Sequence, residues 1–184
     1  IRGTTYLVTA NEGDAKAYDE FSEETLLIKL QLDKTMFPNA NILQLLENLR
    51  RPATTTTAGD TDGDGDQDLI FAYGGPSFSI WAKDGTLIFA SGNAFENVIS
   101  RHSPQLLNAN GSMEKADDHS DDEGPEPEAL AFGEIDGRIY AFIGMERNNA
   151  IFAYDITLPS DPHMVGYMMP SSAHNSPEGL EFIS

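Results

Sequence analysis

The stretch that decides the fold is residues 129–156, A-L-A-F-G-E-I-D-G-R-I-Y-A-F-I-G-M-E-R-N-N-A-I-F-A-Y-D-I. Its apolar runs are separated by Asp136-Gly137 and by Asn148-Asn149. Tight hairpin turns need positive φ at their central residues, a conformation that Gly, Asn and Asp adopt more readily than other residues. The stretch therefore predicts an antiparallel meander of strands joined by short turns.

A similar pattern occurs upstream, where L-I-F-A-Y, S-F-S-I-W and T-L-I-F-A follow one another between residues 69 and 90. Asp84-Gly85 marks a hairpin between the last two runs. Further strands are predicted at residues 6–9, 26–32 and 164–169. Residues 39–50 carry apolar side chains at helical spacing and predict a short helix.

These strands are apolar on both faces, which indicates sheets stacked on sheets rather than a two-layer sandwich. A repeat supports this reading, because P-E-A-L-A-F at residues 127–132 recurs as P-E-G-L-E-F at residues 177–182. The sequence thus predicts an all-β fold, a β-propeller of antiparallel four-stranded blades with one or two short inserted helices. The abrupt ends of the chain favour a partial propeller, with the remaining blades supplied by the same or another chain.

Residues 1–184 are read as a single propeller domain or a fragment of one. The segments, in order, are a partial blade with a helical insertion (1–58), a calcium loop and blade (59–92), an acidic insertion (93–125), a blade (126–170) and the start of the next blade (171–184).

The composition of the chain limits the kinds of partner and chemistry to be expected. The net charge is −19 and the isoelectric point about 4.2, which disfavours nucleic acid and anionic membranes as partners and favours divalent cations. The chain has no cysteine, which excludes disulfides and thiolate chemistry, and no apolar run long enough to span a bilayer.

The loop D-T-D-G-D-G-D-Q-D at residues 60–68 fits the D-x-D-x-D-G calcium pattern, with Gly65 at the sharp turn. Its carboxylates are the predicted calcium ligands: Asp60, Asp62, Asp64, Asp66 and Asp68. Phe71 stands where an EF-hand has its bidentate glutamate, and a strand rather than a helix is expected to follow. The alternative is a solvated acidic turn without an ion.

A second set of acids precedes or ends predicted strands. Glu128 and Glu178 begin the repeated P-E strands, which would line the central channel of a propeller, and Glu12 and Glu146 end other strands near its mouth. Such carboxylates can bind a cation or acquire raised pKa values suited to acid–base chemistry. Alternatively, each glutamate caps a neighbouring backbone or pairs with Arg147 or Arg138.

Several motifs occur in order along the chain: T-Y-L-V-T-A-N-E-G-D, F-P-N-A, G-D-T-D-G-D-G-D, S-F-S-I-W, S-D-D-E-G-P-E-P-E, F-I-G-M-E-R and S-P-E-G-L-E-F-I-S. Together they resemble the choice-of-anchor I family, whose members include cell-surface glycoproteins and secreted proteins labelled alkaline phosphatases. The resemblance implies a β-propeller exported to the cell surface, the periplasm or the medium. It also makes candidates of the acids in these motifs: Glu12, Asp14, Asp121, Asp122, Glu126, Glu128, Glu146 and Glu178.

The leading functional hypothesis is a secreted or cell-surface calcium-binding module with an unidentified extracellular ligand or surface partner. The alternative is a calcium-dependent phosphoesterase, in which clustered carboxylates hold cations that polarise phosphate and activate water. Its candidate catalytic residues are Glu128, Glu146, Glu178 and Arg147. A third reading is a structural surface-layer component, for which the sequence has no distinguishing mark.

Overall fold

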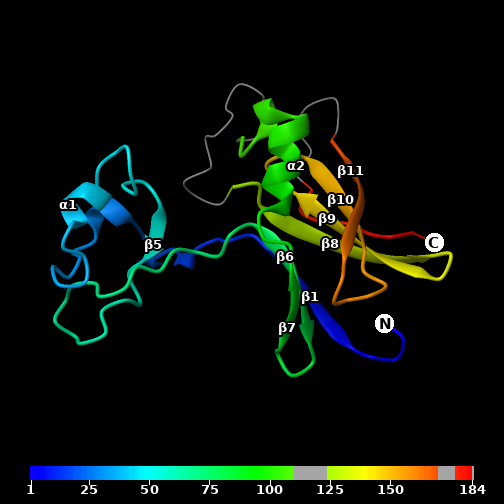
Figure 1. Cartoon of the computed structure of the whole chain (residues 1–184), viewed down its shortest axis with the longest axis horizontal. Coiled ribbons are helices and arrows are strands. Elements are labelled where there is room, and N and C mark those ends of the chain that lie inside the picture. The colour runs from blue at the N-terminus through cyan, green and yellow to red at the C-terminus, as the bar shows by residue number, and fades with distance from the viewer. Residues whose placement is uncertain (110–123, 170–176, 184) are drawn as a thin grey trace. The chain divides into compact units, whose positions relative to one another are not determined.

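The chain divides into two compact units in a computed structural model that describes residues 1–109, 124–169 and 177–183 (Figure 1). The sheet unit comprises residues 1–12 and 75–184, and the inserted unit comprises residues 13–74. The sheet unit consists mainly of antiparallel strands with two short helices, and the inserted unit adds short strands, so the described chain is mostly β, as the sequence predicted.

The largest sheet is the predicted meander. It contains β8 (Pro127–Ile135), β9 (Arg138–Met145), β10 (Ala150–Asp155) and β11 (His163–Met168), in the spatial order β11-β10-β9-β8. Asp136 and Gly137 both have positive φ, at 51° and 75°, as the tight β8–β9 turn requires. The four strands are neighbours in chain order, which is the antiparallel meander that the sequence predicted.

A second sheet has the order β1-β6-β7, formed by β1 (Tyr6–Asn11), β6 (Ser77–Ala82) and β7 (Leu87–Ala90). The pairing of β1 with β6 runs antiparallel from Tyr6↔Ala82 to Asn11↔Ser77. The whole inserted unit therefore lies, in chain order, between two neighbouring strands of one sheet. Turn residues and strand patterns cannot reveal such a long-range pairing.

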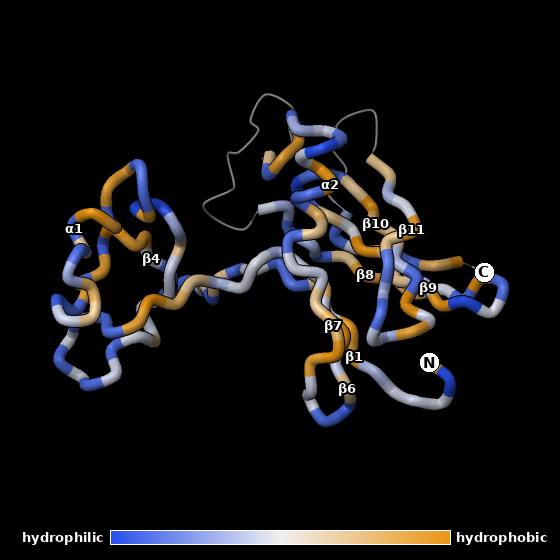
Figure 2. The backbone as a smooth tube through the Cα atoms, in the orientation of Figure 1, coloured by the Kyte–Doolittle hydropathy of each residue, from blue (hydrophilic) through white to orange (hydrophobic). Residues whose placement is uncertain are grey.

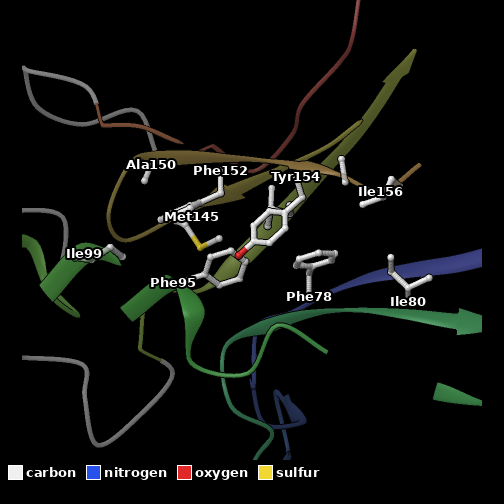
Figure 3. Close-up of a cluster of buried hydrophobic side chains, with 11 residues drawn as sticks. Phe78, Ile80, Phe95, Ile99, Met145, Ala150, Phe152, Tyr154 and Ile156 are labelled. Carbon is white, nitrogen blue, oxygen red and sulfur yellow. The ribbon is translucent and has the colours of Figure 1, made fainter. Parts of the chain in front are cut away.

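The core of the sheet unit lies between these two sheets and the helix α2 (Ala94–His102), as Figure 3 shows. Phe78 of β6 and Phe95 of α2 are fully buried, and both rings contact Tyr154 of β10 at centroid distances of 4.7 and 6.3 Å. Phe95 also packs 4.9 Å from Phe152. A short 3-10 helix, η2 (Pro104–Leu106), follows α2.

The opposite face of the large sheet carries small residues where residues 177–183 pack on it. An added Cβ at Gly133 of β8 would lie within 3 Å of the Phe182 ring, which stacks 5.8 Å from Phe142. At Gly144 the neighbours of an added Cβ include Pro177 and Leu180. The second P-E repeat thus covers part of this face, so that apolar side chains lie on both sides of the sheet, as the sequence predicted.

The inserted unit has little regular structure. Its elements are β2 (Ala17–Tyr18), β3 (Phe21–Ser22), β4 (Glu24–Leu26), the 3-10 helix η1 (Leu27–Lys29), α1 (Ala40–Leu43) and β5 (Ala53–Thr55). β2 pairs with β3 and β4 with β5, both antiparallel. The parallel bridge Leu32↔Gln67 joins the aspartate loop to an earlier segment of the chain.

Two predicted strands in this unit are wrong. The side chains of residues 26–32 alternate as in a strand, but the strand ends at Leu26. The chain continues there into η1, in which the Leu30 N–H donates to the Leu27 carbonyl. The Gln44 side chain donates to the carbonyls of Leu27 and Leu30 and so stabilises this turn. Residues 69–73 form only the isolated bridge Thr54↔Ala72.

The predicted helix at residues 39–50 is shorter than expected. α1 ends at Leu43, and Figure 2 shows that the chain in and around it is rich in hydrophobic residues. The apolar side chains at helical spacing are exposed rather than buried: Ile42, Leu45, Leu46 and Leu49. Within the described residues no closed ring of blades is present, so the β-propeller itself stays a prediction.

Candidate metal sites

The aspartate loop is held in shape by its own backbone. Both carboxylate oxygens of Asp60 accept hydrogen bonds, one from the Gly63 N–H at 2.6 Å and the other from the Gly65 N–H at 3.0 Å. Gly63 and Gly65 have φ values of +82° and +97°, which side-chain-bearing residues rarely adopt. The glycines that separate the acids therefore let the chain curl around the Asp60 carboxylate.

The carboxylates of this loop gather into two groups. Oxygens of Asp60, Asp62 and Asp68 lie within 4.8 Å of one another, and so do those of Asp33, Asp66 and Asp68. Asp68 belongs to both groups. Four of the five predicted ligands are thus brought together with at least one other, whereas Asp64 belongs to neither group and accepts a bond from the Asp66 N–H.

Asp33 is a member that sequence reasoning missed. Its carboxylate accepts hydrogen bonds from Thr35 N–H and Met36 N–H, and its own N–H donates to the Gln67 carbonyl. The backbone pairing of residues 31–33 with Gln67 brings Asp33 to the loop. Spacing along the sequence carries no signal for that long-range contact.

The pKa values of Asp66 and Asp68 are shifted in opposite directions. Partial burial, followed by repulsion from Asp64, Asp33, Asp68 and Asp62, raises the pKa of Asp66. Hydrogen bonds from the Thr61 hydroxyl and backbone lower the pKa of Asp68 instead. These bonds favour the ionised form of Asp68, which is the acid shared by both groups.

A third group lies in the sheet unit, where oxygens of Glu12, Glu126 and Glu146 approach within 4.8 Å of one another. Glu12 directly follows β1, Glu126 directly precedes β8, and Glu146 directly follows β9. The Glu146 N–H donates to the Glu126 carbonyl at 2.9 Å, which fixes the two backbones side by side. Pairing of β8 with β9 therefore brings Glu126 and Glu146 together, and Glu12 joins them from the end of β1 in the other sheet. The positions of Glu12 and Glu146 at strand ends had suggested that these two lie together.

Glu126 is fully buried and has a φ of +50°, and its Oε2 lies 2.6 Å from the Arg147 Nε. Arg147 Nη1 also lies 3.5 Å from Glu146 Oε1. Burial and a hydrogen bond with Glu126 raise the pKa of Glu146 to about 7, against the lowering effect of Arg147. A carboxyl that titrates near neutrality can exchange a proton in acid–base chemistry.

The other acids predicted from the motifs lie elsewhere. Glu128 and Glu178 are exposed and belong to none of the three groups. At the start of β8 the buried acid is Glu126, two residues before Glu128. Asp14 is exposed and accepts a hydrogen bond from the Ala15 N–H. Asp121 and Asp122 lie outside the described residues.

Fold and sites together define an acidic, mostly β module whose carboxylates converge in groups suited to hard cations. The profile of the choice-of-anchor I domain matches residues 1–159, and the chain belongs to this family. Choice-of-anchor domains indicate a protein of the cell surface or extracellular space. No helix among the described residues is long and apolar enough to cross a membrane.

The chain is similar to Gigasin-3a of Magallana gigas, with 36% identity over 98 residues. The matched region is 50% of this chain and 34% of that protein, so the similarity spans about a third of the relative's length. No solved structure matches the chain.

Proposed function

We propose that this chain is a secreted or cell-surface module that binds calcium through residues 60–68 and recognises an extracellular ligand. The observation that carries the proposal is the convergence of Asp60, Asp62 and Asp68, whose carboxylate oxygens lie within 4.8 Å of one another. Calcium takes oxygen ligands from carboxylates, backbone carbonyls and water in flexible geometries, whereas magnesium demands stricter geometry and keeps more of its own water.

The loop also suits calcium because its acids repel one another. Without a cation, Asp66 has a raised pKa for which neighbouring aspartates are partly responsible. A divalent ion between the carboxylates would replace this repulsion with attraction and order residues 60–68. Membership of the choice-of-anchor I family supports the extracellular placement, where calcium is abundant.

We further propose that the sheet β8–β11 is one blade of a β-propeller. The support is its four antiparallel strands in meander order and the apolar side chains on both of its faces. The repeated P-E segment at residues 177–182 would then begin the next blade.

The calcium proposal is tested by the melting temperature of the protein in excess calcium and in chelator. Calcium is expected to raise the melting temperature of the unmodified chain by about 4 °C or more, because an ion that binds only the folded state stabilises it. Asp68→Asn, which removes the acid shared by both groups, should abolish the shift. Asp84→Asn, in an exposed turn of the sheet unit, is the matched control and should keep it.

An equal calcium shift in the unmodified protein and in Asp68→Asn would refute a site at residues 60–68. A shift abolished by Glu146→Gln, but not by Asp68→Asn, would move the ion to the glutamate group.

A calcium-dependent phosphoesterase is the second candidate. The observation in its favour is the glutamate group, where the pKa of Glu146 is about 7 and Arg147 stands beside the carboxylates. The same Arg147 is already ion-paired with Glu126 and Glu146, which weakens its suitability for holding phosphate. The test is calcium-dependent hydrolysis of an aryl phosphate. Activity that is lost in Glu146→Gln would favour this candidate, and no hydrolysis by the unmodified chain in calcium would reject it.

A further inference from the structure

The inserted unit contains a cavity of about 640 Å³ next to the aspartate loop. Its lining combines the polar side chains of Gln31, Asn41 and Gln44 with the half-buried ring of Phe37, and Lys34 and Asp66 are its charged residues. Cavities of this size accommodate small organic ligands. By contrast, the cavity of about 530 Å³ beside β1 is lined mainly by aliphatic and aromatic side chains.

Backbone hydrogen bonds fix the walls of the cavity. Gln67 N–H donates to the Gln31 carbonyl at 2.8 Å, and Asp33 N–H donates to the Gln67 carbonyl at 3.0 Å. These two bonds join the wall that carries Gln31 to the loop that carries Asp66.

The Phe37 wall is fixed in a similar way. Phe37 N–H donates to the Asp33 carbonyl at 2.8 Å, while the Asp33 carboxylate caps the turn at Thr35 and Met36. The Gln44 amide nitrogen is bonded to two carbonyls and anchors the chain after α1. Hydrogen bonds therefore hold the walls of the cavity in place before a ligand binds, and this preorganisation lowers the entropic cost of binding.

From this lining we infer that the cavity binds a saccharide, and the inference rests on the proposed function for its dependence on calcium. Planar amide and carboxylate groups, as on Asn41 and Asp66, can each bond two neighbouring hydroxyl groups of a sugar ring. An aromatic ring such as that of Phe37 packs against the apolar C–H face of the same sugar. Lys34 adds a positive charge that favours an acidic sugar, such as a uronic acid.

Asp66 connects this cavity to the cation-binding loop. Its side chain lines the cavity, and its carboxylate oxygens lie within 4.8 Å of those of Asp33 and Asp68. An ion in the loop would fix the position of the Asp66 carboxylate, and so present its oxygens to the hydroxyl groups of the sugar. Saccharide binding at this cavity is thus calcium-dependent.

The test uses the full chain on an array of neutral and uronic-acid-containing oligosaccharides, in calcium and in chelator, followed by titration calorimetry of the saccharides retained. We expect binding only in calcium. Phe37→Ala and Asn41→Ala should each weaken it about ten-fold, the effect of losing one good contact. Phe21→Ala and Asn39→Ala alter exposed residues of the same unit that do not line the cavity, and should leave the affinity unchanged.

The failures of the two proposals are distinguishable. A protein whose melting temperature responds to calcium, but which retains no saccharide, overturns the inference and leaves the calcium proposal standing. Saccharide binding that Phe37→Ala and Asn41→Ala leave unchanged places the ligand elsewhere and also overturns the inference. Binding that persists in chelator overturns its calcium dependence.

Discussion

The Arg147 Nε lies 2.6 Å from Glu126 Oε2, and the Glu126 side chain is completely buried whereas Arg147 is 29% exposed. Glu126 directly precedes β8 and has a positive φ of 50°. Because burial removes the hydration of the carboxylate, the fold depends on the guanidinium as its counter-charge.

Arg147→Met should therefore destabilise the sheet unit by about 3 kcal/mol, because the change leaves a buried carboxylate without its counter-charge. The measurement is the free energy of unfolding from urea denaturation at neutral pH. Arg101→Met, on the exposed side of α2, is the control and should change stability by less than about 0.5 kcal/mol. A loss at Arg147 no larger than at Arg101 would mean that the pair does not support the fold.

Phe78 should be one of the most costly core positions to truncate. It is fully buried and contacts the rings of Phe89, Phe95 and Tyr154, so Phe78→Ala removes contacts to both sheets and leaves a cavity. We expect a loss of about 3 to 5 kcal/mol in the free energy of unfolding. Phe132→Ala, at a side chain 46% exposed, should cost clearly less, and equal losses would contradict the core as described.

Gly133→Ala tests the packing of residues 177–183 on the large sheet. The new methyl group would lie within 3 Å of the Phe182 ring, so the C-terminal segment must move away from β8. Hydrogen exchange of the amides at residues 178–183 should become faster, with the rest of the sheet unaffected. Gly166→Ala, where an added Cβ meets nothing within 4 Å, is the matched control. Unchanged exchange in Gly133→Ala would show that Phe182 does not cover this glycine.

Asp155 should contribute to stability in acid. Hydrogen bonds from Thr157 and the Arg138 guanidinium lower its pKa from 3.8 to about 2. The unfolded chain binds this proton more readily than the folded chain, so the contribution is present above pH 3.8 and is lost as the pH falls towards 2. Asp155→Asn should make the decline in stability between these pH values less steep, as urea denaturation at several pH values would show. Asp161→Asn, at an exposed carboxylate, should leave the slope unchanged, and identical slopes in all three proteins would refute the assignment.

The local parts of the fold could be predicted from the sequence, and the long-range parts could not. Turn residues such as Asp136-Gly137 and Asp84-Gly85 mark hairpins that form as predicted, because a turn is set by the conformations of two or three residues. The pairing of β1 with β6 across the inserted unit depends on tertiary packing, which no local pattern records. The false strand at residues 26–32 has the same origin, since the Gln44 side chain stabilises a turn where alternation indicated a strand.

In the candidate sites, too, the residues that lie close together in the sequence could be predicted, and those brought in from elsewhere in the chain could not. The spacing of residues 60–68 identifies Asp60, Asp62 and Asp68 because they lie in one short loop. Asp33 joins Asp66 and Asp68 only through backbone pairing with a segment far along the chain. In the glutamate group, the repeated P-E motif drew attention to Glu128, but its side chain is exposed and Glu126 is the buried acid. Which of two nearby acids faces inward depends on the backbone at the start of β8, where Glu126 adopts positive φ.

The most direct test of the calcium site is an anomalous-difference map from crystals of the full chain grown in calcium. If calcium binds this loop, an ion peak is expected between the carboxylates of Asp60, Asp62 and Asp68, with Asp33 and Asp66 beside it. A map with no peak at residues 60–68, or with calcium only among Glu12, Glu126 and Glu146, would contradict the calcium proposal.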